Sequence, residues 1–158
     1  MARVALPVVM PGFAVAKHYV GIPLGPTEWI PIDQQRVDRF TSAVGDTNWI
    51  HRDPERASRE SPWKGTVVPG YLLLSLVPDL LPRLTVLLGW TTAINAGVDG
   101  CVFGNPAPVG SRVRLGASLV RARIFPGDGV RLTFAIRFEV EGALEPACTG
   151  RVHYAYFP

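Results

Sequence analysis

Asp46 and His51 lie five positions apart in a segment that begins with the turn formers Gly45, Asp46, Thr47 and Asn48. A carboxylate and an imidazole can together hold a water molecule and move its proton, which is general acid-base chemistry. Regular helix or strand at this spacing would direct the two side chains apart, because only positions three or four apart share a helical face and strand positions alternate. We therefore expect a folded-back loop that brings both side chains to one point.

The residues alone leave a second interpretation of this pair open. On a soluble protein, a loop aspartate and a loop histidine are more often solvated or hydrogen-bonded to neighbours than catalytic. A metal site built from Asp46, His51 and Asp53 is disfavoured, because no second histidine or cysteine stands at ligand spacing. Asp53 instead precedes Pro54 and Glu55, which is typical of a helix N-cap followed by a proline at the first helical position and an acidic first turn.

A helix is predicted immediately before the loop. Residues 1–32 are rich in proline and glycine, and residues 28–32 form a short extended segment at most. Asp33 is a suitable cap for a helix that stops at Gly45. Along this helix the apolar residues Val37, Phe40 and Val44 recur at helical spacing, whereas residues 34–36, 38 and 39 are polar.

A second, very different helix is predicted over residues 71–77. It starts after Pro69 and Gly70, and we expect it to end or kink near Pro78 or Pro82. Its side chains are apolar all round, apart from one serine. A helix of this kind must be covered on every side.

The second half of the chain changes to the two-residue repeat of half-buried strands. Strands are expected over residues 90–103, 112–119, 130–140 and 152–156. Turn formers at 126–129 and 141–142 predict that neighbouring strands pair antiparallel. This order of elements predicts an α+β fold in which an antiparallel sheet wraps around one apolar helix. The chain has 158 residues, 47% of them hydrophobic, and shows no repeat or linker, so one domain over residues 1–158 is expected.

Charge and hydropathy exclude several classes of partner. Net charge is +3, but the 16 lysines and arginines are scattered without a basic run, so nucleic acid is not an expected partner. The predominance of arginine is consistent with contacts to a phosphorylated handle such as that of coenzyme A. No uncharged apolar stretch reaches the ~18 residues of a membrane helix, so we expect a soluble protein with no membrane partner.

Cysteine usage and the N-terminus bear on the cellular compartment. Cys101 and Cys148 lie in apolar, strand-like surroundings without C-x-x-C spacing, which favours buried reduced thiols over a disulfide or a zinc site. This fits a reducing cytoplasm. Arg3 and the apolar residues 5–15 imitate a short secretory signal, but two prolines and a glycine interrupt the stretch, so we expect no signal there.

Several motifs also occur together in a characteristic order. They are Glu28-Trp29-Ile30, residues 35–40, 45–53, 54–57 and 70–76, residues 108–114, and Pro146-Ala147-Cys148. Over nearly the whole chain this series resembles the MaoC-like dehydratase family of hot-dog folds, and within it the group named after nodulation protein N. The resemblance implies a hot-dog fold and a homodimer whose sheets join edge to edge, with each acyl tunnel near the interface. An unpaired sheet edge would otherwise be open to aggregation.

The resemblance also implies roles for individual residues. Asp46 and His51 hold the water that adds across a carbon-carbon double bond. The amide of Gly70, at the start of the apolar helix, donates to the thioester oxygen, which gains negative charge in the transition state. Ser75 matches a serine that hydrogen-bonds near this dyad, and Asn48 matches an asparagine that keeps the shape of the loop.

One position departs from the family pattern. Relatives commonly have a histidine immediately before the glycine, where this chain has Pro69. Proline is tolerated at the start of a helix, but any substrate contact through the imidazole is lost. For Ser75, a hydrogen bond to the preceding turn is an equally open interpretation, and Gly70 can have a purely backbone role.

The activity implied by the resemblance is that of a hydro-lyase. It would hydrate a trans-2-enoyl thioester of coenzyme A or an acyl carrier protein, reversibly, to the (R)-3-hydroxyacyl thioester, without a cofactor. Three alternatives stay open: a dehydratase of a specialised polyketide-like metabolite, a hot-dog thioesterase, and a non-catalytic acyl-thioester-binding subunit. A thiol-trapping assay would detect the free thiol that a thioesterase releases. Binding of an acyl-CoA without turnover would indicate a non-catalytic acyl-thioester-binding subunit.

Overall fold

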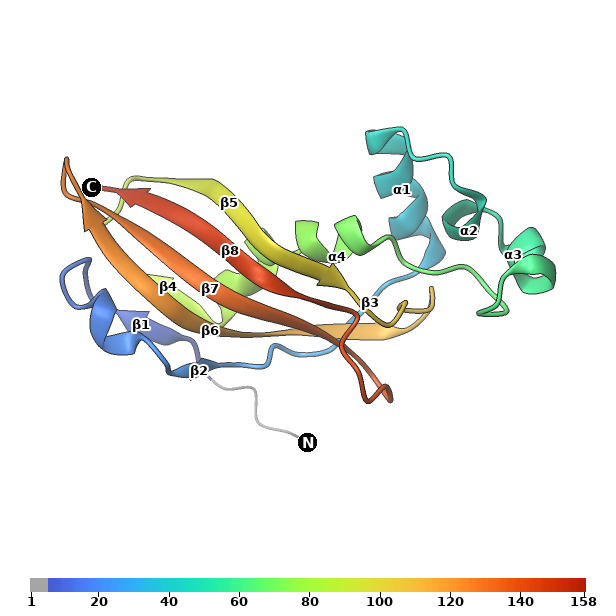
Figure 1. Cartoon of the computed structure of the whole chain (residues 1–158), viewed down its shortest axis with the longest axis horizontal. Helices are drawn as coiled ribbons and strands as arrows, with labels where there is room; N and C mark the ends of the chain where they lie inside the picture. The colour runs from blue at the N-terminus through green and yellow to red at the C-terminus, as the bar shows by residue number, and fades with distance from the viewer. Residues whose placement is uncertain (1–5) are drawn as a thin grey trace.

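The structure is a computed structural model that describes residues 6–158. Its strands are β1 (Val8–Met10), β2 (Pro23–Leu24), β3 (Ile30–Pro31), β4 (Thr85–Leu87), β5 (Thr92–Phe103), β6 (Arg112–Phe125), β7 (Gly129–Val140) and β8 (Cys148–Phe157). Its helices are α1 (Gln34–Val44), α2 (Trp49–Arg52), α3 (Pro54–Glu60), α4 (Gly70–Ser75) and α5 (Val77–Leu80), with short 3-10 turns at Ala16–Tyr19 and Leu81–Arg83. The long strands lie along the long axis of the molecule, and α1, α2 and α3 lie beyond one end of them (Figure 1).

The main sheet has six strands in the order β2-β6-β7-β8-β5, and β3 also pairs with β6. The pairs β6-β7 and β7-β8 are antiparallel, as the turn formers predict. β5 joins β8 antiparallel rather than its sequence neighbour, so it forms one edge of the sheet. Antiparallel strands with helices on one side confirm the predicted α+β fold.

The inner face of the sheet forms most of the core. Leu132, Phe134, Ile136 and Phe138 of β7 are at most 3% exposed, which confirms the two-residue repeat predicted for residues 130–140. Phe134 lies directly between Leu119 of β6 and Val152 of β8. The polar residues of the repeat face the other side of the sheet.

The central apolar helix is broken where the prolines predict. α4 ends at Ser75, α5 begins at Val77 with Pro78 in its first turn, and a 3-10 turn containing Pro82 follows. The expectation that this helix is covered on every side is wrong for a single chain. Tyr71 on α4 is 69% exposed, because the sheet covers only the flank that buries the leucines of the helix.

The N-terminal region holds structure that the sequence analysis missed. β1 pairs in parallel with β4, and Met10 at the end of β1 is buried. Of the signal-like stretch, Arg3 and Ala5 lie outside the described residues, while residues 8–10 form this strand. Three-residue strands carry too little alternation to be read from sequence.

The structure bears on the expected burial of the two cysteines and on membrane spanning. Cys148 is buried and Cys101 is only half-buried, and their sulfur atoms lie 3.8 Å apart as free thiols. The expected burial therefore holds fully for one of the two cysteines. Within residues 6–158, no helix combines the length and the apolar character needed to span a membrane.

Candidate active site

The end of α1 sets the position of Asp46. Asp33 caps the start of this helix, since its side chain accepts a hydrogen bond from the Arg36 amide at 2.8 Å. Gly45 ends it in the left-handed conformation, with φ of 73°, which favours glycine. The Asp46 amide then donates to the Thr41 oxygen at 2.9 Å, so the carboxylate follows the last helical turn directly.

Asn48 joins Asp46 to the helix that carries His51. The Asn48 amide donates to Oδ1 of Asp46 at 2.9 Å, and the Asn48 side chain caps α2 by accepting from the Ile50 amide. The predicted loop is therefore confined to residues 46–48. His51 lies instead in a one-turn helix, because the asparagine supplies the cap that a helix start needs.

His51 is held in one orientation by the backbone of residue 67. Its Nδ1 lies 2.6 Å from the Val67 oxygen, which can only accept, so Nδ1 carries the proton. Nε2 is then the nitrogen with the free lone pair, and it lies 4.0 Å from Oδ2 of Asp46. This separation exceeds a hydrogen bond, so the two atoms are placed to share a water molecule. The His51 and Asp46 side chains are 13% and 32% exposed, which keeps both groups accessible from a partly closed site.

Gln34 supports this arrangement from the first turn of α1. Its side-chain nitrogen donates to the His51 backbone oxygen at 2.7 Å and to Asp38 at 2.8 Å. Its side-chain oxygen accepts from the Thr66 hydroxyl at 2.8 Å. From the sequence, Gln34 had no expected role in the site. The two partners that connect Gln34 to the site lie 17 and 32 residues away, so no local pattern could have identified this role.

Gly70 and His51 line the same cavity, which has a volume of about 200 Å³. The Gly70 amide opens α4 and has no backbone acceptor among the described residues. A side chain here would collide with Phe103 at the end of β5, because a Cβ on Gly70 would lie 2.5 Å from its ring. Pro69, which precedes the glycine, is buried and has no donor of its own.

Ser75 lies elsewhere. Its hydroxyl donates to the Leu72 oxygen at 2.7 Å, and it lines a cavity of about 260 Å³ between α4 and the edge strand β5. A further cavity of about 180 Å³ shares Pro78 and Tyr154 with this one and includes Tyr156. Within one chain, the structure therefore brings together Asp46, Asn48, His51 and Gly70, but not Ser75.

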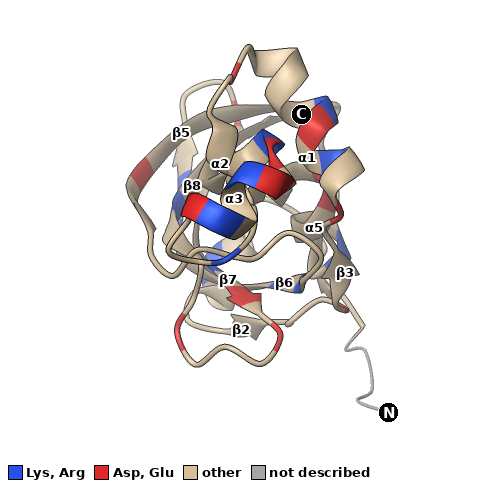
Figure 2. Cartoon of the chain, turned by 90° about the vertical axis from the view of Figure 1, so that its right-hand side faces the viewer, with Lys and Arg blue, Asp and Glu red and all other residues tan. Residues whose placement is uncertain are grey.

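The helices beside the site carry charges of both signs. Figure 2 views the end of the molecule where α1, α2 and α3 lie and shows acidic and basic residues interspersed on α1 and α3. Asp53 caps α3 by accepting from the Arg56 amide at 2.9 Å, which confirms its predicted structural role. Neither helix presents a field of one sign to an approaching ligand.

Comparison with known proteins identifies the family. A model described as MaoC like domain matches residues 16–133. The chain is 40% identical over 128 residues to 3-hydroxyacyl-thioester dehydratase Z of Mycobacterium tuberculosis, covering 81% of this chain and 84% of that protein. It is 35% identical over 131 residues to nodulation protein N of Rhizobium leguminosarum bv. viciae, covering 82% and 81%.

The fold agrees with this assignment. The unliganded R-hydratase from Pseudomonas aeruginosa superimposes with a TM-score of 0.69 at 18% identity, over 87% of this chain and 81% of that one. At this identity the likeness concerns the fold alone, and it confirms the predicted hot-dog architecture. By its motifs, its matched domain and its relatives, this chain belongs to the MaoC-like dehydratase family.

Proposed function

We propose that this protein catalyses the reversible hydration of a trans-2-enoyl thioester to the (R)-3-hydroxyacyl thioester. One observation carries the proposal. The protonated Nδ1 of His51 is held by the Val67 oxygen, so the basic Nε2 is turned toward the Asp46 carboxylate, in a cavity that also contains the start of α4. The name of one relative, 3-hydroxyacyl-thioester dehydratase Z, supports thioester chemistry in the dehydration direction.

The reaction needs three things from the protein. A water molecule held between Asp46 and His51 loses a proton to this dyad as its oxygen bonds to the β-carbon. The α-carbon gains a proton, so that the elements of water are added across the double bond. Negative charge that develops on the thioester oxygen is stabilised by the free amide of Gly70 at the start of α4. In dehydration the same groups act in reverse.

The acyl chain would enter the apolar cavities beside α4. The cavities of about 260 Å³ and 180 Å³ share Pro78 and Tyr154, so together they extend from Ser75 toward the sheet. Pro69 replaces an imidazole near the thioester, so selectivity for the carrier and the chain would rest on these cavities. Coenzyme A and an acyl carrier protein are both suitable carriers.

We also propose a homodimer joined along β5. The outer edge of this strand has no partner among the described strands, and three of its apolar side chains are more than 48% exposed, which are Ile94, Val98 and Val102. A second copy paired there would cover this edge and the bare flank of α4 around Tyr71. The cavity that contains Ser75 is partly built by β5, so it would lie next to the junction.

The decisive test is turnover with matched variants. Loss of the conjugated absorbance is followed with crotonyl-CoA and longer trans-2-enoyl-CoA esters. Asp46→Asn and His51→Ala should each lower kcat by at least about 100-fold. Asp53→Asn and His18→Ala are the controls, because they change the same residue types at a helix cap and on an exposed turn. Absence of water addition at every chain length, or equal loss in the controls, would contradict the proposal.

A second candidate is the dehydration of an oxygenated, polyketide-like acyl thioester. The hydroxyl-bearing side chains of Tyr154 and Tyr156 line the cavity of about 180 Å³. They favour an oxygenated acyl chain over a purely aliphatic one. Faster dehydration of a 3,5-dihydroxyacyl thioester than of its 3-hydroxy counterpart would support this second function. Equal or slower dehydration would favour the simple acyl substrate.

A further inference from the structure

Besides the exposed Arg151 of β8, the outer face of the sheet, opposite α4, carries two groups of arginines that differ in their pairing. Toward the end where β6 starts and β7 ends, three arginines are ion-paired with Glu139 or Glu141. They are Arg112, Arg114 and Arg137. Toward the other end, three arginines form no ion pair with a carboxylate of residues 6–158. They are Arg121, Arg123 and Arg131, which we call the arginine cluster.

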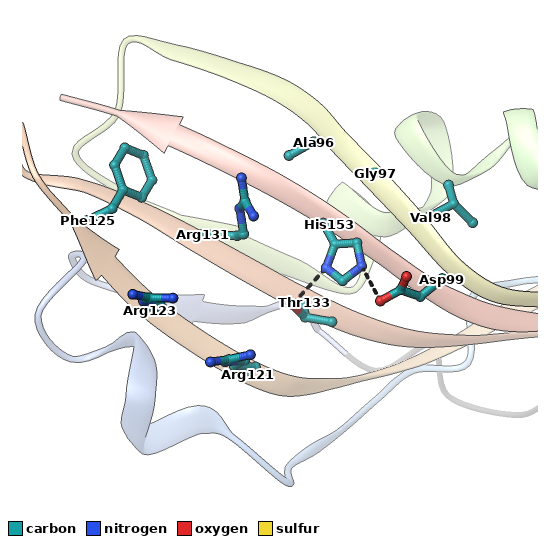
Figure 3. A pocket seen from close by; sticks show the side chains of 10 residues that line it. All are labelled: Ala96, Gly97, Val98, Asp99, Arg121, Arg123, Phe125, Arg131, Thr133 and His153. Atoms are coloured by element: carbon teal, nitrogen blue, oxygen red, sulfur yellow. Dashed lines mark hydrogen bonds and ion pairs between the residues drawn. The ribbon is translucent and has the colours of Figure 1, made fainter.

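The arginine cluster lines a cavity of about 630 Å³ on this face. Figure 3 shows its side chains on the same side of β6 and β7 as Phe125, with His153 of β8 and Asp99 of β5 across the cavity. Residues of four adjacent strands thus surround one space. Its volume lies in the range of small-molecule sites, about 300–1,000 Å³. This cavity shares no lining residue with the one that contains His51.

Two members of the cluster face each other directly. Arg123 and Arg131 are cross-strand partners in the β6-β7 ladder. Like charges at directly opposed positions destabilise a sheet. An anion bound between the two guanidinium groups would attract both of them and offset their mutual repulsion.

The carboxylate of the cavity is already engaged by another group. Oδ2 of Asp99 lies 3.0 Å from Nε2 of His153, and Nδ1 of that ring lies 2.9 Å from the Thr133 hydroxyl. Asp99 is therefore bonded to the imidazole and to none of the three arginines. Three guanidinium groups face one carboxylate, which leaves an excess of positive charge in the cavity.

The structure assigns this cavity to a nucleotide-sized organic phosphate that carries at least two phosphate charges. Planar guanidinium groups match phosphate oxygens two at a time, and several converging arginines select for multiple charges. The Phe125 ring at the rim offers an aromatic surface to a base. A free nucleotide and the nucleotide end of coenzyme A share this chemistry. The assignment of this site does not depend on the proposed hydratase activity, although the cavity shares Gly97, Val98 and His153 with the cavity that contains Ser75.

Calorimetric titration of the intact protein tests the site with adenosine 3′,5′-bisphosphate, ATP, tripolyphosphate and adenosine. We expect saturable binding of the three anions but not of adenosine. Arg123→Gln/Arg131→Gln should weaken binding by about 100-fold, since each charged hydrogen-bonding group contributes about tenfold or more. Arg112→Gln/Arg137→Gln is the matched control, because it removes the same two charges from the same face. Its affinity should stay within about twofold, which distinguishes a built site from long-range attraction.

Two further readouts complete the test. Thermal unfolding of Arg123→Gln/Arg131→Gln should occur at or above the wild-type temperature, since the variant removes a repulsive pair. If the site serves the substrate, this variant raises KM for crotonyl-CoA but not for crotonyl-pantetheine, whereas a free-nucleotide site leaves both KM values unchanged. No saturation by any of the anions at millimolar concentration, or equal loss in the matched control, overturns the assignment.

Discussion

The backbone oxygen of Val67 accepts from Nδ1 of His51 at 2.6 Å, three residues before the free amide of Gly70. One short stretch of chain therefore orients the imidazole and also presents the donor at the start of α4. The proposed base and the proposed oxyanion donor cannot shift independently, because residues 67–70 are buried or half-buried and tie them together.

Gln34 should act as a positioning residue. Gln34→Ala removes the bonds to the His51 backbone and to Thr66, so we expect kcat for enoyl-CoA hydration to fall by about tenfold or more, since small displacements of catalytic groups are costly. The exposed neighbour Gln35→Ala is the control and should keep full activity. A variant whose stability falls while kcat is unchanged would assign Gln34 a structural role only.

The contact between Gly70 and Phe103 should be tight enough to measure. Gly70→Ala places a methyl group 2.5 Å from the Phe103 ring, and we expect a loss of about 1–3 kcal/mol in the free energy of unfolding by urea. In the Phe103→Ala background, Gly70→Ala should cost little further stability, because the ring that the new methyl group would meet is gone. Additive losses in the double variant would show that the ring is not the obstacle.

Asn48 and Asp53 cap neighbouring helices but should differ in their effect on turnover. Asn48→Ala and Asp53→Ala should each cost about 1 kcal/mol of stability. Only Asn48→Ala should also lower kcat, because α2 carries His51 while α3 carries no residue of the site. Parallel urea denaturation and kinetics check this, and equal kcat values for the two variants would argue against it.

The protein should lose stability at alkaline pH partly through Tyr156. Burial, with a smaller contribution from Tyr154, raises the pKa of the Tyr156 hydroxyl to about 12. In the unfolded chain this group ionises near pH 10, so between these values the unfolded state binds fewer protons and the free energy of unfolding falls as pH rises. The slope from this group is up to about 1.4 kcal/mol per pH unit.

Tyr156→Phe should flatten that part of the pH dependence. The Cys148 thiol, whose pKa burial raises to about 12, remains in the variant and keeps its own contribution of the same sign. Urea denaturation of both proteins between pH 9 and pH 12 measures the difference. Identical slopes would mean that Tyr156 does not remain protonated in the folded protein through this range.

The sequence predicted those elements whose signals are local. The caps Asp33 and Asp53 and the stop at Gly45 define α1 and α3, and the alternation of residues 130–140 defines β7. Each depends on residues within a turn or two of one another. The pairing of Asp46 with His51 followed from residue type and turn chemistry, although the single turn of helix at α2 did not.

What the sequence did not reveal depends on contacts between distant segments. Gln34 acquires its role only when residues 51 and 66 come to its side chain. The arginine cluster looked scattered along the chain, but antiparallel pairing brings Arg123 opposite Arg131. The bare flank of α4 likewise could not be predicted, because an apolar helix sequence does not specify whether its own chain or another molecule covers each side of the helix.

That bare flank has a thermodynamic consequence. With Tyr71 in water and one strand edge unpaired, a lone subunit has an incomplete interior. In the proposed dimer, association and folding would be parts of one equilibrium, so dilution alone would act as a denaturant. Each tenfold rise in protein concentration should then stabilise the native pair by about 1.4 kcal/mol, and the melting temperature should climb with it. A melting temperature that does not change with protein concentration would mean that the lone subunit is stable without its partner.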